Sequence, residues 1–158
     1  MGVSAAGKST IGLAASALTG VTFLDADDRH PPQNIAKMAA GIALTDADRA
    51  PWLDAVGTAL RDERPCIMAC SALRRLYRDR LRELAPHTVF ALLQLPRAEL
   101  ERRIAARTDH FMPAGLLDSQ LATLEPPGSD EEVVVLDATR PIDELAAVVA
   151  SLLTPRVD

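Results

Sequence analysis

The N-terminal stretch MGVSAAGKST limits the possible folds more than any other part of this sequence. Gly2, Gly7, Lys8 and Ser9 fit the spacing G-x-x-x-x-G-K-[ST], which is typical of a loop between a buried strand and a helix. Backbone N–H groups of such a loop, with the positive end of the helix, bind nucleotide phosphates. The alternative is a flexible N-terminus with an ordinary helix behind it. We expect nucleotide contacts from Gly2, Ser4, Ala5, Ala6, Gly7, Lys8, Ser9 and Thr10, with Lys8 also catalytic and Ser9 a Mg²⁺ ligand.

Short apolar runs alternate with longer helical patterns along the rest of the chain. Continuous apolar character, as expected of buried parallel strands, predicts strands at 21–25, 66–70, 89–95 and 133–137. Helical patterns predict helices at about 8–18, 32–40, 49–63, 74–84, 97–107, 114–124 and 142–153. In the third of these, Asp48 is the expected N-cap and Pro51 lies in the first turn. The order predicts a single α/β domain over residues 1–158, with helices on both faces of a parallel sheet.

Length and charge limit the partners that the chain can have. Its 158 residues suffice for one domain, and a formal net charge of −5 argues against broad binding of nucleic acid or of an anionic membrane. The sequence contains neither an apolar run of the roughly 18 to 20 residues that span a membrane nor a signal peptide. Cys66 and Cys70, four apart in one predicted strand, are too distant for a disulfide. These features predict a soluble, cytoplasmic protein.

Two carboxylates stand at the end of the first predicted strand. Asp25 and Asp27 are two residues apart, so their side chains project on the same side of an extended chain. Near a phosphate loop, such a pair can hold hydrated Mg²⁺ and accept a proton from an attacking hydroxyl. The alternative is that one aspartate caps the next helix, although Asp28 is closer to that helix and suits the cap better. We therefore expect Asp25 to support the metal and Asp27 to act as the general base.

Residues 25–53, DADDRHPPQNIAKMAAGIALTDADRAPWL, resemble the signature of gluconate kinases, and the resemblance continues at 70–82, 107–127 and 133–146. It implies a P-loop kinase fold and the ATP-dependent phosphorylation of D-gluconate on its 6-hydroxyl, with Mg²⁺ as cofactor and a homodimer as the assembly. It also implies substrate-binding helices at about 30–63 and a lid at about 107–125. The alternatives are a shikimate- or nucleotide-type kinase on the same fold, and a truncated nucleotide-binding fold without turnover.

A sugar acid needs cations for its carboxylate, and an acidic chain must supply them locally. The expected substrate contacts are Asp27, His30, Lys37, Arg49, Arg78 and His110. Arg103 and Arg107 stand four residues apart on one helix face, and the resemblance implies that both contact the nucleotide or the transferred phosphoryl group. Each cation has an ordinary alternative, such as a structural His30, a solvated Lys37, or an Arg103 paired with Glu99.

The strand that should precede the phosphate loop is missing or nearly so, because Met1 alone stands before Gly2. The resemblance implies that this strand is central in the sheet. Losing three or four buried aliphatic side chains, at roughly 1.5–3 kcal/mol each, would cost about 5–12 kcal/mol, comparable with the stability of a whole domain. We therefore expect the working enzyme to begin upstream of Met1. Ala5 stands where the family usually has glycine, so we also expect slightly altered loop geometry.

Overall fold

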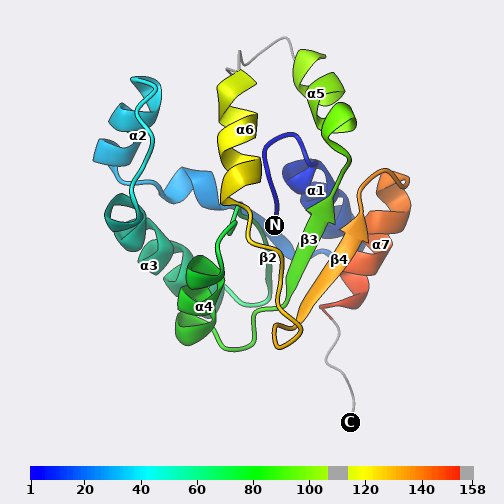
Figure 1. Ribbon diagram of the computed structural model, residues 1–158. Coiled ribbons are helices and arrows are strands. Elements are labelled where there is room, and N and C mark those ends of the chain that lie inside the picture. Colours follow the sequence, from blue (N-terminus) through cyan, green and yellow to red (C-terminus); the bar gives the residue numbers. More distant parts are fainter. Residues whose placement is uncertain (107–113, 154–158) are drawn as a thin grey trace.

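The computed structural model describes residues 1–106 and 114–153, in which helices and strands alternate (Figure 1). The strands are β1 (Thr22–Asp25), β2 (Cys66–Ala69), β3 (Phe90–Gln94) and β4 (Val133–Asp137). The helices are α1 (Lys8–Thr19), the short 3₁₀ helix η1 (Ala26–Arg29), α2 (Pro32–Ala39), α3 (Asp46–Asp62), α4 (Arg75–Leu84), α5 (Arg97–Ala105), α6 (Ala114–Thr123) and α7 (Ile142–Ser151). Each predicted strand and helix is present, with ends that differ by a few residues.

The strands lie between two layers of helices. Because successive side chains of a strand point to opposite faces, β2 contributes to two separate hydrophobic clusters. Ile67 packs with Ala15 of α1 and Ala146 of α7, whereas Met68 packs against a cluster that includes Trp52 of α3. Helices α1 and α7 therefore cover one face, and α3 and α4 cover the other. The predicted three-layer α/β fold is confirmed.

The strands form two parallel pairs. In the first pair, β1 runs beside β2, with Thr22 opposite Cys66. In the second pair, β3 runs beside β4, with Phe90 opposite Val133. The carboxyl ends of parallel strands meet at one edge, where the ligands of open α/β folds bind. Asp25, the last residue of β1, lies at this edge.

Met1 and Gly2 connect the two pairs of strands. The amino group of Met1 donates a hydrogen bond to the Ala91 carbonyl, and the Met1 carbonyl accepts one from the Leu93 N–H at 3.0 Å. The Gly2 N–H donates to the Ser71 carbonyl at 3.1 Å, just beyond β2. The residues that lead into the phosphate loop thus lie between β2 and β3, in the central position that the resemblance implies.

Helix α3 begins at Asp46 and not at the predicted residue 49. Its N-cap is Thr45, so the predicted cap at Asp48 is wrong. The Thr45 hydroxyl accepts from the Asp48 N–H at 3.2 Å, and the Asp48 carboxylate accepts from the Thr45 N–H at 3.0 Å. This reciprocal capping box satisfies two N–H groups at once. Pro51 consequently lies inside the helix and not in its first turn.

The predicted cap at Asp28 is also wrong. The N-cap of α2 is Pro31, which offers no side-chain hydrogen bond. The aspartate that does cap is Asp25, whose carboxylate accepts from the Asp27 N–H at 3.1 Å and so begins η1. This bond turns the chain sharply at the end of β1 and holds Asp27 next to Asp25.

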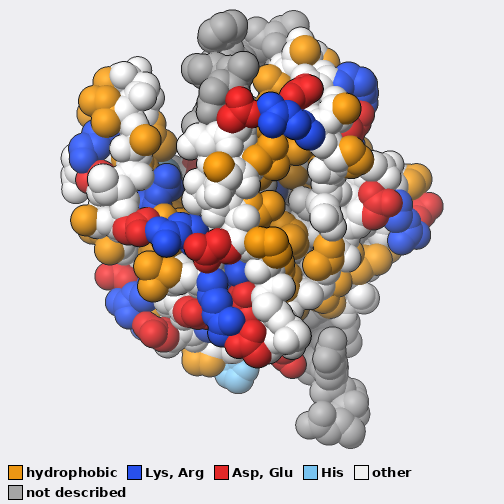
Figure 2. Space-filling view, in the orientation of Figure 1, with side chains coloured by type: hydrophobic (Ala, Val, Ile, Leu, Met, Phe, Trp, Pro, Cys, Tyr) orange, Lys and Arg blue, Asp and Glu red, His pale blue; other side chains and the backbone are white. Residues whose placement is uncertain are grey.

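Charged side chains of both signs lie next to one another on the surface (Figure 2). Beside α4, Arg74 pairs with Asp46, and Arg75 pairs with Asp130. Such exposed pairs contribute little to stability, but they neutralise arginines that would otherwise attract anions. Among residues 1–106 and 114–153, none of the helices is both long and apolar enough to cross a membrane.

Candidate functional site

The phosphate loop turns through residues with left-handed backbone angles. Gly7, the N-cap of α1, has φ of 95°, and Ala5 has φ of 63°. Glycine adopts such angles freely, whereas a residue with a Cβ is strained there by roughly 1–2 kcal/mol. Gly2 also has a positive φ, and a Cβ at this position would lie 3.0 Å from the Leu93 carbonyl oxygen. Ala5 is therefore held in a backbone conformation that carries local strain.

Lys8 and Ser9, in the first turn of α1, face the inside of the loop and the end of β1. The Lys8 ammonium donates to the Val3 carbonyl across the loop at 3.0 Å. The Ser9 hydroxyl donates to a carboxylate oxygen of Asp25 at 3.1 Å. A hydroxyl and a carboxylate are oxygen ligands of the kind that Mg²⁺ prefers. Within the part of the chain that the structure describes, no cluster of three or more His, Cys, Asp or Glu could hold a metal.

Asp27 lies between the phosphate loop and the start of α2. Its side chain is 83% exposed, so a ligand can reach it. Desolvation raises the pKa of Asp27, and the neighbouring Asp25 carboxylate raises it further, whereas Lys8 and His30 act in the opposite direction. The structure thus brings the predicted general base within electrostatic reach of Asp25, of the loop lysine and of His30.

His30 lies behind Asp27 and is almost enclosed. Its side chain is 5% exposed and stacks on Trp52, with ring centroids 4.6 Å apart and planes 8° from parallel. The Nε2 atom lies 3.9 Å from Oδ1 of Asp27. Desolvation lowers the pKa of His30, Asp27 raises it, and Arg49 lowers it. One face of His30 is therefore packed on Trp52, while its Nε2 edge lies near Asp27, and its predicted contact with substrate stays a prediction.

Lys37 and Arg49 differ in how they are held. The Lys37 ammonium donates to the Asp48 carboxylate at 2.7 Å, and this bond is the main reason why the pKa of Asp48 is lowered to about 2. A substrate carboxylate would have to compete with Asp48 for Lys37. The Arg49 guanidinium lies 5.8 Å from the centroid of the Tyr77 ring and close enough to His30 to lower its pKa. Arg49 is therefore at the same end of the site as His30.

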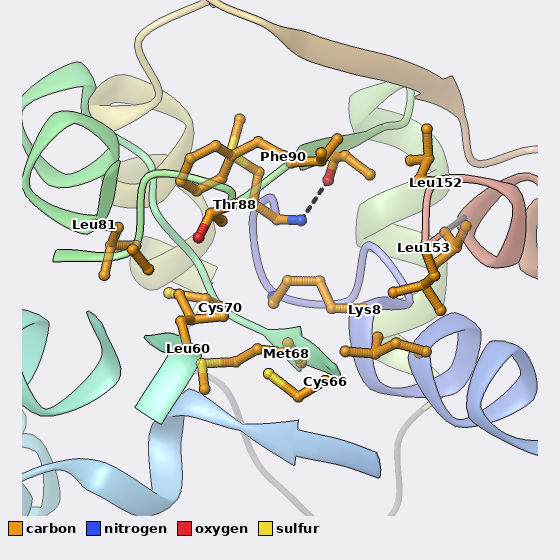
Figure 3. A pocket seen from close by; sticks show the side chains of 18 of the residues that line it. Lys8, Leu60, Cys66, Met68, Cys70, Leu81, Thr88, Phe90, Leu152 and Leu153 are labelled. Carbon is orange, nitrogen blue, oxygen red and sulfur yellow. Dashed lines mark hydrogen bonds between the residues drawn. The ribbon is translucent and has the colours of Figure 1, made fainter. Parts of the chain in front are cut away.

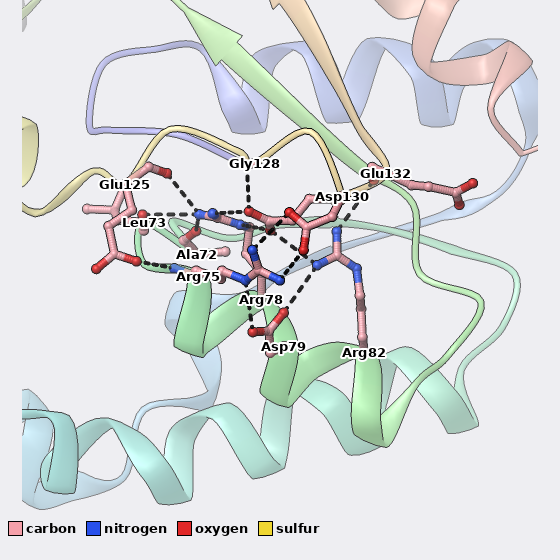
Figure 4. A network of polar contacts seen from close by, with 11 residues as sticks. Ala72, Leu73, Arg75, Arg78, Asp79, Arg82, Glu125, Gly128, Asp130 and Glu132 are labelled. Atoms are coloured by element: carbon pink, nitrogen blue, oxygen red, sulfur yellow. Dashed lines mark hydrogen bonds and ion pairs between the residues drawn. The ribbon is translucent and has the colours of Figure 1, made fainter.

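Arg78 is fully buried, and its donors are occupied (Figure 4). It donates to both carboxylate oxygens of Glu131, at 2.6 and 2.8 Å, and to the carbonyls of Ala72, Leu73 and Glu125. Burying a guanidinium is costly unless its N–H groups are paired in this way. The structure therefore corrects the predicted contact between Arg78 and substrate, because Arg78 instead fixes the segment 125–131 to the start of α4.

Arg103 lies beside the phosphate loop. A Cβ placed on Gly7 would lie 3.6 Å from a terminal nitrogen of Arg103. The Arg103 Nε donates to Glu99 at 2.8 Å, and another terminal nitrogen donates to the Ala138 carbonyl at 3.0 Å. Arg103 thus pairs with Glu99 and lies beside the phosphate loop at the same time, so the ion pair does not keep it away from the loop.

Helix α6, the second part of the predicted lid, touches the loop directly. The Gln120 side-chain oxygen accepts from the Ser4 N–H at 2.6 Å, and Leu117 belongs to the same core cluster as Val3. Sequence reasoning missed Gln120, because a single glutamine on a helix gives no signal until the fold places it on the loop. Arg107 and His110 lie outside the described residues, so their predicted contacts stay predictions.

A cavity of about 260 Å³ lies between β2 and β3 (Figure 3). Its labelled lining is mainly apolar and includes Met68, Cys70, Leu81 and Phe90, with Lys8 at one wall. Walls that are mainly apolar, with few polar side chains such as Lys8 and Thr88, do not suit a polyol, whose hydroxyls each need a hydrogen-bond partner. The candidate site is therefore the group of polar side chains at the end of β1, and not this cavity.

Comparison with known proteins identifies the family. Residues 1–127 match a domain family described as AAA domain. The gluconokinase of Gluconobacter oxydans (strain 621H) is 45% identical over 138 residues, which cover 85% of this chain and 78% of that protein. The thermoresistant gluconokinase of Escherichia coli (strain K12) is 40% identical over 152 residues, which cover 93% of this chain and 87% of that protein.

Solved structures agree with this result. A sugar kinase from Janibacter sp. HTCC2649 has a TM-score of 0.88 at 44% identity and covers 97% of this chain and 91% of its own. A gluconokinase from Sinorhizobium meliloti 1021 has a TM-score of 0.86 at 45% identity, and the match covers 97% of this chain and 88% of that protein. Because identity at this level extends over most of each protein, this chain belongs to the gluconokinase family and has the fold of a P-loop kinase.

Proposed function

We propose that this chain transfers the terminal phosphoryl group of ATP to the 6-hydroxyl of D-gluconate. One observation carries the proposal: the Ser9 hydroxyl of the phosphate loop is bonded to Asp25, and Asp27 follows two residues later with an exposed carboxylate. In this proposal, the phosphate-binding element and the proton acceptor are neighbours at the edge of the sheet. The similarity to gluconokinases supports gluconate as the acceptor.

The phosphate loop holds the nucleotide in this proposal. Its backbone N–H groups and the start of α1 bind the phosphates, and Lys8 adds a positive charge. Ser9 and Asp25 would hold Mg²⁺, since their oxygens lie 3.1 Å apart and suit a hard cation. When bound, the ion neutralises charge on the phosphate oxygens. Arg103 is placed to contact the transferred phosphoryl group, because it lies beside Gly7.

The acceptor is bound and activated at the other end of the site. Asp27 accepts the proton of the 6-hydroxyl, because its exposed carboxylate follows Asp25 at the end of β1 and an acceptor can reach it. We assign the gluconate carboxylate to Arg49, because Arg78 is buried and Lys37 is paired with Asp48. Arg107 and His110 retain the proposed lid role, in which closure excludes water from the phosphoryl group.

A coupled assay of ADP release tests the proposal. The full chain, with Mg²⁺ and ATP, is given gluconate, shikimate or a nucleoside monophosphate, and a Lys8→Ala preparation measures the background. We expect kcat/KM to be highest for gluconate. Faster turnover of shikimate or of a nucleotide would contradict the proposed acceptor. A folded chain that releases no ADP with any acceptor would favour the non-catalytic alternative.

We also propose a cytoplasmic homodimer. Support comes from the family and from exposed apolar side chains on α2 and the segment after it, namely Ile35, Met38 and Ile42. Light scattering coupled to size exclusion would show a mass of about twice 16.9 kDa if the dimer forms. A mass of one chain at assay concentration would contradict it.

A further inference from the structure

Asn34 is a buried polar side chain on the first turn of α2. It has no exposed surface, and its amide nitrogen lies 2.8 Å from the Asp48 carbonyl and 3.4 Å from Nδ1 of His30. Among the described residues, its amide oxygen has no hydrogen-bond partner. Burying an unpaired amide oxygen costs free energy, so this asparagine does not serve stability alone.

The orientation of the Asn34 amide follows from the Asp48 carbonyl. A carbonyl oxygen only accepts hydrogen bonds, so the group that faces it at 2.8 Å must be the amide NH₂. The second hydrogen of the same NH₂ is then available to the His30 ring. Nδ1 of His30 can take this hydrogen bond only as an acceptor, which requires a lone pair on Nδ1 and no proton.

We propose that Asn34 is a positioning residue that holds His30 as the neutral tautomer with its proton on Nε2, directed at Asp27. In this tautomer the Nε2–H faces the Asp27 carboxylate, whose Oδ1 lies 3.9 Å away. The catalytic meaning of this arrangement rests on the proposed function, in which Asp27 accepts the proton of the acceptor hydroxyl. The tautomer itself follows from the geometry alone.

The ring has little freedom to escape this arrangement. Its face is stacked on Trp52 at 4.6 Å, and the Trp52 indole N–H is in turn bonded to the Ala26 carbonyl at 2.7 Å. Trp52 belongs to α3 and Ala26 to η1, so the stack connects the two elements that flank the acceptor end. A ring flip would bring the Cδ2 edge to Asn34 and remove the acceptor from the amide.

Burial favours the neutral ring more strongly than the surrounding charges oppose it. Asp27 of η1 attracts a positive charge, while Arg49 of α3 repels one, and Lys37 and Asp48 are paired with each other. Desolvation by burial lowers the pKa of His30. A proton on Nδ1 would in addition face the Asn34 NH₂, which places two donors against each other. The neutral ring with its proton on Nε2 therefore offers an N–H toward Asp27.

This N–H would hold the base in position for catalysis. An exposed carboxylate samples several rotamers, and a fixed donor 3.9 Å away attracts one oxygen electrostatically, although it is too distant for a hydrogen bond, and leaves the other to accept a proton. Asn34 acts one step further away, since it acts on His30 and touches neither Asp27 nor substrate. A His30 ring with its proton on Nδ1 would instead present a lone pair to the carboxylate and repel it.

Nitrogen NMR of the histidine rings tests the tautomer in the full, unaltered chain, because ¹⁵N chemical shifts distinguish protonated from unprotonated ring nitrogens. The ring resonances of His30 are identified as those that disappear from the spectrum of a His30→Gln variant. We expect an unprotonated Nδ1 and a pKa below the ordinary value of about 6.5. A proton on Nδ1 at neutral pH in the wild-type chain overturns the proposal without any need for a variant.

Asn34→Asp supplies the matched perturbation, since its carboxylate has the same shape and accepts where the amide donates. We expect the proton of His30 to move to Nδ1, its pKa to rise, and kcat to fall about tenfold while KM for gluconate changes little. Gln33→Glu makes the same charge change at an exposed neighbouring position and should leave the His30 resonances and kcat at wild-type values.

The outcomes separate this inference from the proposed function. Unchanged His30 nitrogen shifts in a folded Asn34→Asp chain would overturn the role of Asn34. A failure of gluconate in the acceptor assay, with the expected tautomer in the NMR spectrum, would overturn the choice of substrate and leave the positioning of His30 intact. Equal effects of Asn34→Asp and Gln33→Glu on kcat would show that added charge, and not tautomer, is responsible.

Discussion

The phosphate end and the acceptor end of the proposed site are built in different ways. The phosphate end is built mainly from one continuous stretch, residues 2–10, whose backbone N–H groups are proposed to bind the phosphates, and Asp25 and Arg103 join it from other elements. The acceptor end is assembled from η1, α2 and α3, and its side chains are held by one another. His30 stacks on Trp52, and Lys37 pairs with Asp48.

This difference determines how each end responds to substitution. A backbone N–H group survives any change of side chain, so at the phosphate end sensitivity is concentrated in the few side chains that carry charge or bind metal. At the acceptor end several side chains share the positioning of one carboxylate. A substitution there is expected to lower kcat less, the farther the substituted residue lies from Asp27.

Lys8→Ala should have the largest effect. Removing a charge that stabilises the transferring phosphoryl group is expected to lower kcat by about 10³-fold, measured by coupled ADP release. The comparison is Lys37→Ala, at the other lysine of the chain, which pairs with Asp48. Its effect should be much smaller. Equal losses of kcat in the two variants would contradict the proposed difference between the phosphate end and the acceptor end. A wild-type kcat for Lys8→Ala would show that residues 2–10 are not the phosphate-binding loop.

Asp27→Asn should come second. Loss of the general base is expected to lower kcat by at least about 100-fold, while ATP affinity is retained because the loop is untouched. Asp28→Asn is the matched control, since Asp28 is an exposed neighbour in the same 3₁₀ helix. Its kcat should equal that of the wild type. Wild-type turnover by Asp27→Asn would exclude this residue as the base and require another proton acceptor.

Arg78→Met should have the smallest effect on catalysis and a large one on stability. Removing one partner of a buried ion pair is expected to cost about 3–5 kcal/mol of unfolding free energy, measured by urea denaturation. The kcat/KM per folded molecule should stay at the wild-type value, because within residues 1–106 and 114–153 the hydrogen bonds of this arginine go to Glu131 and to backbone carbonyls. A raised KM for gluconate in a fully stable variant would instead place Arg78 in the substrate site.

The same ion pair makes the acid stability of the chain predictable. The bond from Arg78 is the main reason why the pKa of Glu131 is lowered to about 2 from its ordinary 4.5. A lowered pKa means that ionised Glu131 stabilises the fold at pH values above 4.5 and that this contribution is lost as the pH falls toward 2. Glu131→Gln should therefore be less stable at neutral pH but lose less stability over this acidic range than the wild type does.

The sequence predicted the phosphate end better than the acceptor end, for physical reasons. The loop is local, so spacing alone places Gly7, Lys8 and Ser9 together, and apolar runs with helical patterns were enough for the α/β fold. Asp25 and Asp27 were placed by their spacing at the end of a strand. Their hydrogen bonds, and the capping role of Asp25, depend on the backbone turn into η1.

The acceptor end depends on contacts between elements, which a pattern along the chain does not reveal. Nothing in the spacing of Arg78 distinguishes a substrate contact from the buried bond to Glu131, 53 residues away. Asn34 and Gln120 likewise gain their partners only when α2 meets α3 and α6 meets the loop. The predicted N-cap of α3 at Asp48 is wrong because Thr45 and Asp48 are both good capping residues. Only the folded backbone, in which each of the two side chains accepts a hydrogen bond from the other residue's N–H, shows that Thr45 is the N-cap.

The hydrogen bonds of Met1 and Gly2 have a consequence for nucleotide affinity. These two residues bond to the strand pair of β3 through Ala91 and Leu93, and to the end of β2 through Ser71. Any movement of one strand pair relative to the other must therefore change the backbone of the loop that begins at Gly2. If the loop binds nucleotide as proposed, nucleotide binding and the spacing of β2 and β3 are therefore thermodynamically linked. A second ligand that favours one spacing of the strand pairs would then change nucleotide affinity by the same factor by which nucleotide changes the affinity for that ligand.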